Sequence, residues 1–193
     1  MGFVNGQPAD AGEQAPFFTH YGHFLWQFSQ VERLCHFVFH QQSGLEESVA
    51  RALIGGEQLS KVTRLLNSLI KAKGDTDRII EMQFLIDQIN VISQLRHDLV
   101  HRGADTMADG TINVSNRMTA KSLESIEILR LNLEHIKGAR GDLECVAIRL
   151  ALFGAPTTME LLDPQWTEIL AAPWRYKRVE PNKPHQPRRG NPQ

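Results

Sequence analysis

The residues best suited to chemistry lie in one short stretch, SQLRHDLVHRG, which runs from Ser93 to Gly103. It places Arg96, His97 and His101 at the end of a segment whose apolar residues recur at helical spacing. An arginine can hold a phosphate through two parallel hydrogen bonds, and an imidazole, with an ordinary pKa of about 6.5, can exchange a proton at neutral pH. These residue types suit phosphodiester cleavage. RNA would supply its own nucleophile, the 2′-hydroxyl, so this chemistry needs no metal.

Helical geometry predicts where these side chains point. At about 100° per residue, Arg96 falls within about 20° of Ile89, the centre of the apolar stripe, while Asp98 lies on the opposite side, where we expect it to be solvated. His97 and His101 are four residues apart and lie one above the other on the flank of the helix. A guanidinium on an apolar stripe is costly unless it is paired, reaches water, or faces a cleft or a second subunit. A two-fold dimer with a shared cleft would explain its position.

Two metal-dependent interpretations of the same stretch stay open. HDLVH, His97 to His101, is similar to the zinc motif H-E-x-x-H with Asp in place of Glu, but no third ligand has a recognisable spacing. Its HD pair also resembles that of metal-dependent phosphohydrolases of the HD type. Those enzymes need a further histidine and aspartate on the same metal; His36, His40 and Asp142 are present but follow no compelling pattern.

Composition predicts an ordinary cytosolic protein without a metal or cofactor. The 193 residues carry a formal net charge of -1, so any attraction to nucleic acid has to come from local patches. The two cysteines, Cys35 and Cys145, lie in apolar helical patterns without zinc-site spacing, which indicates small core residues in a reduced compartment. The polar start has neither the basic region nor the apolar run of a signal peptide, and no segment has the roughly 20 apolar residues of a membrane span.

Apolar periodicity predicts one helical domain between two flanking segments. We expect a flexible leader over 1–16, a helical domain over 17–153, and an appendage with a Pro-rich, basic, disordered tail over 154–193. The aromatic residues between Phe17 and Phe39 follow the helical period and should form core. The basic tail either solubilises the chain or grips RNA.

Within the helical domain, the pattern predicts a first long helix to about residue 42, then a shorter helix, a break or kink at Gly55–Gly56, and a helix to Lys73 closed by Gly74. Asp75 or Thr76 should cap the next helix, which ends at Gly103. A small hairpin or ordered loop fits 107–115. A further helix is expected from residue 119 or 122 to 136, with another after the KGARG interruption.

The stretch RHDLVH, from Arg96 to His101, resembles the R-x4-6-H motif of the HEPN superfamily, in which a polar residue such as His97 commonly follows the arginine. The resemblance implies an all-α, HEPN-like bundle with long antiparallel helices. It further implies a metal-independent endoribonuclease that dimerises through the motif-bearing helix, here about 76–102, and acts as a toxin or phage-defence effector. An antitoxin or nucleotidyltransferase could then be its partner.

The resemblance also assigns roles to residues. Arg96 and His101 would be catalytic and His97 supportive, Arg102 would help bind RNA, and Glu32 on the first long helix would supply an acidic group near the site. The alternative is a non-catalytic HEPN-like module for binding or dimerisation, whose arginine and histidines serve an interface. An open cleft shared by two copies of the motif would favour the nuclease, whereas a motif sealed in the core would favour the module.

Overall fold

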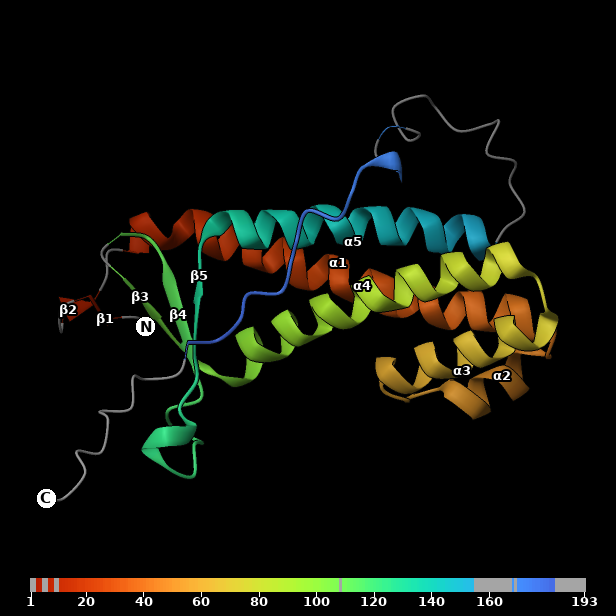
Figure 1. The fold of residues 1–193 in the computed structure, drawn as a ribbon, viewed down its shortest axis with the longest axis horizontal. Coiled ribbons are helices and arrows are strands. Elements are labelled where there is room, and N and C mark those ends of the chain that lie inside the picture. The colour runs from red at the N-terminus through yellow and green to blue at the C-terminus, as the bar shows by residue number, and fades with distance from the viewer. Residues whose placement is uncertain are drawn as a thin grey trace, which may run out of the picture.

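The computed structural model describes the backbone of residues 3–4, 7–8, 11–107, 109–154, 168 and 170–182, and side chains from residue 16 onward within these ranges. Most of the described residues are helical, and a small antiparallel sheet lies at one end of the helices (Figure 1). The helices are α1 (Ala11–Ser43), α2 (Glu47–Ile54), α3 (Leu59–Lys73), α4 (Thr76–His101) and α5 (Leu133–Gly154). The strands are β1 (Phe3–Val4), β2 (Gln7–Pro8), β3 (Gly103–Thr106), β4 (Ile112–Ser115) and β5 (Ile128–Leu131), with a 3₁₀ turn, η1, at Leu123–Ser125.

Helices α1 and α5 lie side by side, and α4 crosses them obliquely, with α2 and α3 at the end away from the sheet (Figure 1). Polar contacts between the helices show in which direction each helix runs relative to the others. His20 meets Arg140, and Gln42 donates to the carbonyl of Phe153, so α1 and α5 run parallel. Helix α4 is antiparallel to α5, because Glu81 pairs with Arg149 and Gln88 with Asp142. The expected antiparallel arrangement therefore holds for α4 and not for the α1–α5 pair.

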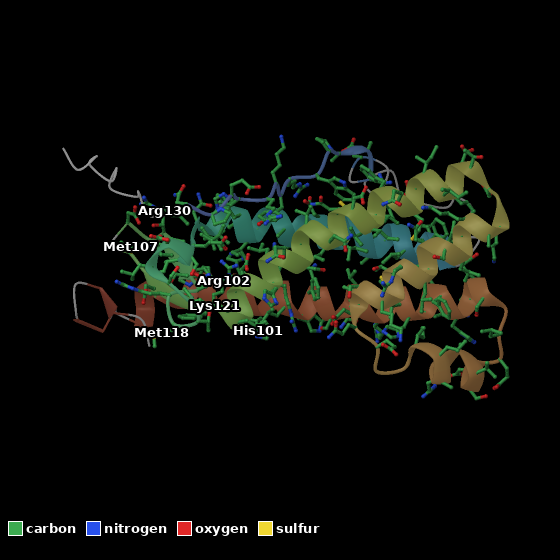
Figure 2. All side chains as sticks on the ribbon, turned by 60° about the horizontal axis from the view of Figure 1, so that its bottom comes forward. His101, Arg102, Met107, Met118, Lys121 and Arg130 are labelled. Atoms are coloured by element: carbon green, nitrogen blue, oxygen red, sulfur yellow. The ribbon has the colours of Figure 1, made fainter. Side chains whose placement is uncertain are left out.

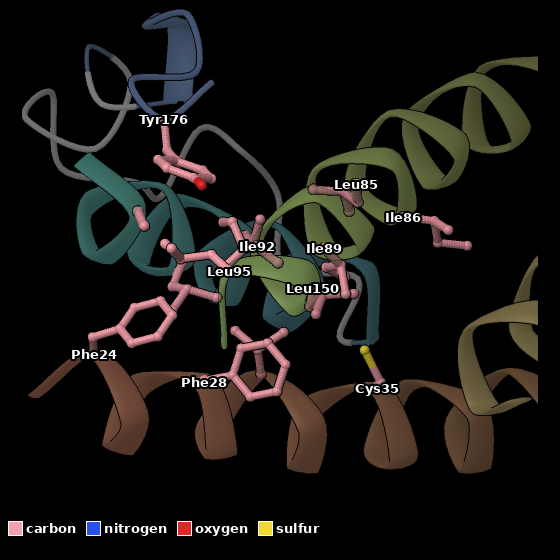
Figure 3. Close-up of a cluster of buried hydrophobic side chains, with 14 of the residues drawn as sticks. Phe24, Phe28, Cys35, Leu85, Ile86, Ile89, Ile92, Leu95, Leu150 and Tyr176 are labelled. Carbon is pink, nitrogen blue, oxygen red and sulfur yellow. The ribbon is translucent and has the colours of Figure 1, made fainter. Parts of the chain in front are cut away.

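The core lies between these three long helices (Figure 3). Phe24 and Phe28 of α1 extend toward α4, whose buried side chains include Ile92 and Leu95. Both cysteines are buried and neither is part of a disulfide, as expected of small core residues. Burial raises the pKa of the Cys35 thiol to about 12. In the described part of the chain, no helix combines the length and the apolar character that crossing a membrane requires.

The local signals around α2, α3 and α4 were predicted correctly. Helix α2 ends before Gly55–Gly56 and α3 begins after it, so the glycine pair is a break. Gly74 closes α3 in the left-handed conformation, with φ of +76°. The carboxylate of Asp75 then accepts a hydrogen bond from the backbone N–H of Arg78, 3.2 Å away, and so caps α4.

The expected hairpin is present, but its first strand, β3, lies before the predicted range of 107–115, and the hairpin is part of a larger sheet. Strands β3 and β4 pair antiparallel, with Gly103 opposite Ser115 and Thr106 opposite Ile112. Asp109 and Gly110 lie in the turn between them, where Gly110 has φ of +75°. Strand β5 pairs with the other edge of β4, which gives the strand order β3-β4-β5.

The helix predicted from residue 119 or 122 to 136 is wrong. Residues 128–131 form β5, with Leu129 and Leu131 buried and Arg130 exposed between them. This alternation fits a half-buried strand, and the free edge of β4 supplies the hydrogen bonds that decide between the two structures. The apolar spacing of three residues in this segment had favoured a helix.

The KGARG stretch does not interrupt a helix either, because α5 runs through it without a break. Its glycines serve close packing. A Cβ on Gly141 would lie 2.9 Å from a terminal guanidinium nitrogen of Arg175, and one on Gly138 would contact the Arg175 backbone. Here the chain segment 170–182, called the C-terminal strap below, passes over α5.

The C-terminal strap is attached through the buried carboxylate of Asp142, which is 1% exposed. This carboxylate accepts hydrogen bonds from the backbone N–H groups of Arg175 and Tyr176, at 2.9 and 2.8 Å, and from the amide of Gln88, at 2.8 Å. At its end the strap pairs with β5 through Asn182. It therefore lies within the 154–193 segment predicted as appendage and tail; the remaining residues of that segment after Gly154, except 168, lie outside the described residues.

The start of the chain also carries structure. Strands β1 and β2 pair antiparallel, and α1 begins at Ala11, inside the segment predicted as a flexible leader. The other leader residues and the side chains before Pro16 lie outside the described part.

Candidate active site

Arg96, His97 and His101 lie on the last two turns of α4. Figure 2 shows His101 at this end of the helix, near the sheet. His97 and His101 are both exposed, and their ring centroids are 4.8 Å apart with the rings tilted by 47°. This is the contact that a spacing of four residues on a helix predicts. The two imidazoles therefore face water side by side and could act on one bound group.

Arg96 is half-buried beside them. Its guanidinium carbon lies 5.8 Å from the centre of the Phe28 ring on α1, within the range of a cation–π contact. It makes no hydrogen bond or ion pair with any described residue. Its charge acts on Tyr21: burial raises the pKa of this phenol, and the Arg96 charge opposes part of that rise. The hydroxyl of Tyr21 donates to the carbonyl of Leu99 at 3.5 Å.

Tyr21 is thus a neighbour of the site that sequence reasoning missed. It belongs to the aromatic series of α1, which was interpreted as core, and its side chain is in fact half-buried. Nothing in its spacing distinguishes it from the other apolar positions of that helix. Only the antiparallel packing of α1 against α4 brings its hydroxyl to the last turn of α4.

Arg96 lies at the edge of the buried face of α4 and not at its centre, because that face rotates around the helix along its length. The buried residues of the last two turns are Leu95, Asp98 and Leu99. At 100° per residue they lie roughly 80° to 180° around the axis from Ile89, whereas Arg96 lies about 20° from it. The sheet and the strap cover α4 at this end, since Leu129 of β5 and Tyr176 border the same small cavity as Asp98. Arg96 can therefore reach water.

Four other arginines are half-buried in the described part of the chain, and each has a polar partner. They are Arg78, Arg102, Arg140 and Arg149. Arg78 and Arg149 also lie over aromatic rings, but Arg96 differs from all four because it has the ring contact without a hydrogen bond or ion pair to any described residue. Its donors remain available to an anion that approaches from solvent.

Asp98 and Arg102 occupy the other side of the same helix end. The prediction that Asp98 is solvated is wrong, since this residue is 7% exposed. Its carboxylate lies 2.9 Å from the Nε atom of Arg102 and also accepts a hydrogen bond from Gln94. A terminal nitrogen of Arg102 donates to Glu127 at 3.2 Å. Two carboxylates therefore hold the guanidinium that was predicted to bind RNA, and they join the end of α4 to the sheet.

Glu32, the predicted acidic group, is half-buried on α1, one turn beyond Phe28. It makes no ion pair with Arg96 or with the two histidines. Its charge acts on Cys35, whose pKa it helps to raise. The structure therefore brings the rings of His97 and His101 into contact, keeps Arg96 on the same helix end, and does not join Glu32 to them.

The additional residues that the HD-type interpretation requires lie on other helices than His97 and His101. Asp142 is held by Gln88 and the strap, while His36 and His40 lie on the second half of α1. Among the described residues, no group of three or more His, Cys, Asp or Glu side chains is placed to hold a metal ion.

What the end of α4 brings together is one half-buried, unpaired guanidinium and two exposed imidazoles in contact. Such a set can bind an anion and transfer a proton close to it. In comparisons with known proteins, no family model, no curated protein and no solved structure matches the chain.

Proposed function

We propose that this protein is a metal-independent endoribonuclease of the HEPN type. Arg96 binds the scissile phosphate and stabilises the charge that develops on it, His101 exchanges the proton, and His97 orients or assists it. The observation that carries the proposal is the guanidinium of Arg96, which has no carboxylate partner in the described part of the chain and belongs to the same two turns of α4 as the two exposed histidines. A phosphate is the partner that this guanidinium lacks.

The reaction needs only groups that these side chains and RNA supply. The 2′-hydroxyl of a nucleotide loses its proton to an imidazole and attacks the adjacent phosphorus, while the bond from phosphorus to the 5′-oxygen breaks. The leaving oxygen takes up a proton from an imidazole, and the products are a 2′,3′-cyclic phosphate and a 5′-hydroxyl. Arg96 contributes by compensating the extra negative charge on the phosphate oxygens in the transition state.

The proposal includes a two-fold dimer through the end of α4. The outer face of its second half is exposed at Asn90, His97, Val100 and His101. A second copy against this face would place two arginines and four histidines around one cleft. Sedimentation at micromolar concentration tests this part, and a monomer throughout would remove the shared cleft from the proposal.

Cleavage of a fluorescent single-stranded RNA in the presence of EDTA tests the chemistry. We expect the parent to cut, and His101→Ala to cut roughly 10²–10⁴-fold more slowly because a proton-transfer group is lost. His36→Ala is the matched control: this histidine is half-buried on α1 and takes no part in the site. The proposal fails if the parent cuts no RNA, if EDTA abolishes cleavage, or if both variants cut as well as the parent.

The second candidate is a non-catalytic module for binding or dimerisation. It is favoured by the contact of Arg96 with Phe28, which can stabilise the fold without any substrate. A parent that forms a dimer but leaves every RNA intact, and whose dimer is weakened by Arg96→Ala, would establish this function instead.

A further inference from the structure

A cleft lies between the parallel helices α1 and α5. It encloses about 550 Å³ and is bordered by His23, Trp26 and Gln27 of α1 and by Arg140 and Glu144 of α5. This volume falls within the range of small-molecule sites, roughly 300–1,000 Å³. Trp26 and Gln27 leave α1 about 200° and 100° around the axis from Phe28, so the cleft opens on a different side of α1 from Arg96. It does not belong to the site on α4.

An aromatic surface forms one wall of this cleft. The side chain of Trp26 is 63% exposed, although it is a large apolar group. Its ring stacks on no other described ring. An exposed indole with a free face can stack on a planar ligand, and flat heterocycles such as nucleobases are bound in this way.

The polar side chains that border the cleft have hydrogen-bonding groups that no described residue uses. The side-chain oxygen of Gln27 is buried and accepts no hydrogen bond. The carboxylate of Glu144 is exposed and pairs with no described residue. One terminal nitrogen of Arg140 contacts His20 at 3.3 Å, which leaves other N–H groups of this guanidinium available. Because the Gln27 oxygen is buried, the cleft offers a ligand one acceptor group, the Glu144 carboxylate, and one donor group, the Arg140 guanidinium, beside an aromatic face.

We propose that this cleft binds an unpaired guanine base. Guanine is the base that presents two adjacent donors, N1–H and the 2-amino group, to a carboxylate such as that of Glu144. The O6 and N7 acceptors match the donors of Arg140. Adenine places an acceptor where the carboxylate lies, and uracil has a single N–H between two carbonyl oxygens. The ring stacks on Trp26.

The base could come from a free nucleotide or from single-stranded RNA, and the two sources require separate measurements. GMP, AMP and IMP, which lacks the 2-amino group, are titrated into the full chain by calorimetry. A guanine-containing oligoribonucleotide and an oligouridine are titrated in parallel. We expect GMP to bind roughly 5- to 150-fold more tightly than AMP, with IMP between them, because one bidentate contact is lost with adenine. If only the oligonucleotide binds, the strand is the source.

Variants assign the binding to this cleft. Glu144→Gln should weaken GMP binding roughly 5- to 150-fold, and Trp26→Ala by a similar factor, while Trp26→Phe keeps a stacking ring and loses less. Glu124→Gln, an exposed glutamate of η1, is the control and should bind GMP as the parent does. Equal affinity for GMP and AMP, an unaffected Glu144→Gln variant, or no binding of either guanine probe overturns the proposal.

This proposal is independent of the nuclease proposal. Arg96 and His101 do not border the cleft, so the variants Arg96→Ala and His101→Ala should bind GMP like the parent. A protein that binds guanine and cuts no RNA would refute only the nuclease, and one that cuts RNA without discriminating guanine would refute only the cleft.

Discussion

Arg96 and Arg102 lie on the same helix end, and the structure uses them differently. Arg102 is bound by Asp98 and Glu127 and links α4 to the sheet. Arg96 has no acidic partner among the described residues and rests on the Phe28 ring. The same residue type, six positions apart, is thus structural in one place and available to a ligand in the other. The difference teaches that burial alone does not identify a functional arginine; its partners do.

The largest expected effect separates the two arginines by activity. Arg96→Ala should lower the rate of RNA cleavage roughly 10²–10³-fold, because it removes the donors that stabilise charge on the phosphate. Arg102→Ala should leave cleavage per folded molecule near that of the parent, because its guanidinium is held by carboxylates. Rates are measured with a fluorescent RNA and corrected for the folded fraction by circular dichroism. An equal loss in both variants would place Arg102 in the site as well.

The next effect concerns the buried carboxylate that attaches the C-terminal strap. Asp142→Ala should lower the free energy of unfolding by about 3 kcal/mol, since it leaves three donors without their acceptor. Urea denaturation measures this value, and faster proteolysis of 170–182 would show that the strap detaches. Asp87→Ala, on the exposed face of α4, is the control and should change stability by less than about 0.5 kcal/mol. Equal stability losses would mean that the strap contributes little.

A smaller loss of stability is expected from Arg102→Ala. The side chains of Arg102 and Asp98 are 19% and 10% exposed, so removing the arginine leaves a carboxylate nearly buried without its partner. We expect a loss of about 2 kcal/mol, below the value for a fully buried pair because water screens part of it. Arg96→Ala is the matched variant and should cost at most about 1 kcal/mol. Urea titrations of Arg102→Ala, of Asp98→Asn and of the double variant measure the coupling energy between Arg102 and Asp98, and Arg96→Ala is titrated for comparison. No coupling energy would contradict the structural role of Arg102.

The smallest expected effect is a dependence of the free energy of unfolding on pH. Burial raises the pKa of the Asp142 carboxyl, and its hydrogen bonds from Arg175, Tyr176 and Gln88 oppose part of the rise. The folded chain therefore keeps this proton to higher pH than the unfolded chain does. Its stabilising contribution is present below about pH 4 and is lost as the pH rises through the raised value. The stability advantage of the parent over Asp142→Asn should shrink over that interval in urea titrations; an advantage that grows would mean that the hydrogen bonds outweigh burial.

Local signals predicted the positions of the first four helices and the contact between two histidines of the site. Gly74 and Asp75 mark the boundary between α3 and α4 because the left-handed conformation and the N-cap each depend on one residue and its nearest neighbours. The contact of His97 with His101 follows from the helix repeat in the same way. Such features need no information from distant parts of the chain.

Signals that compete locally gave the wrong structure. Leu129 and Leu131 fit a strand, but their segment also fits a helix, and the pairing with β4 decided between them. The glycines of KGARG appear as helix breakers in the sequence, yet Gly138 and Gly141 lie within α5, where Arg175 of the strap packs against them. In both cases the deciding contact comes from a segment far away in the chain.

For the candidate site, the amino-acid order was enough to place Arg96, His97 and His101 on one helix end, since helical geometry alone relates residues one or two turns apart. Tertiary packing decided which of the neighbouring charged side chains form ion pairs. The sheet and the strap bury Asp98 and pair it with Arg102, while α1 offers Arg96 only the ring of Phe28. Whether a charged side chain is paired depends on groups brought from distant segments, and helical periodicity carries no information about them.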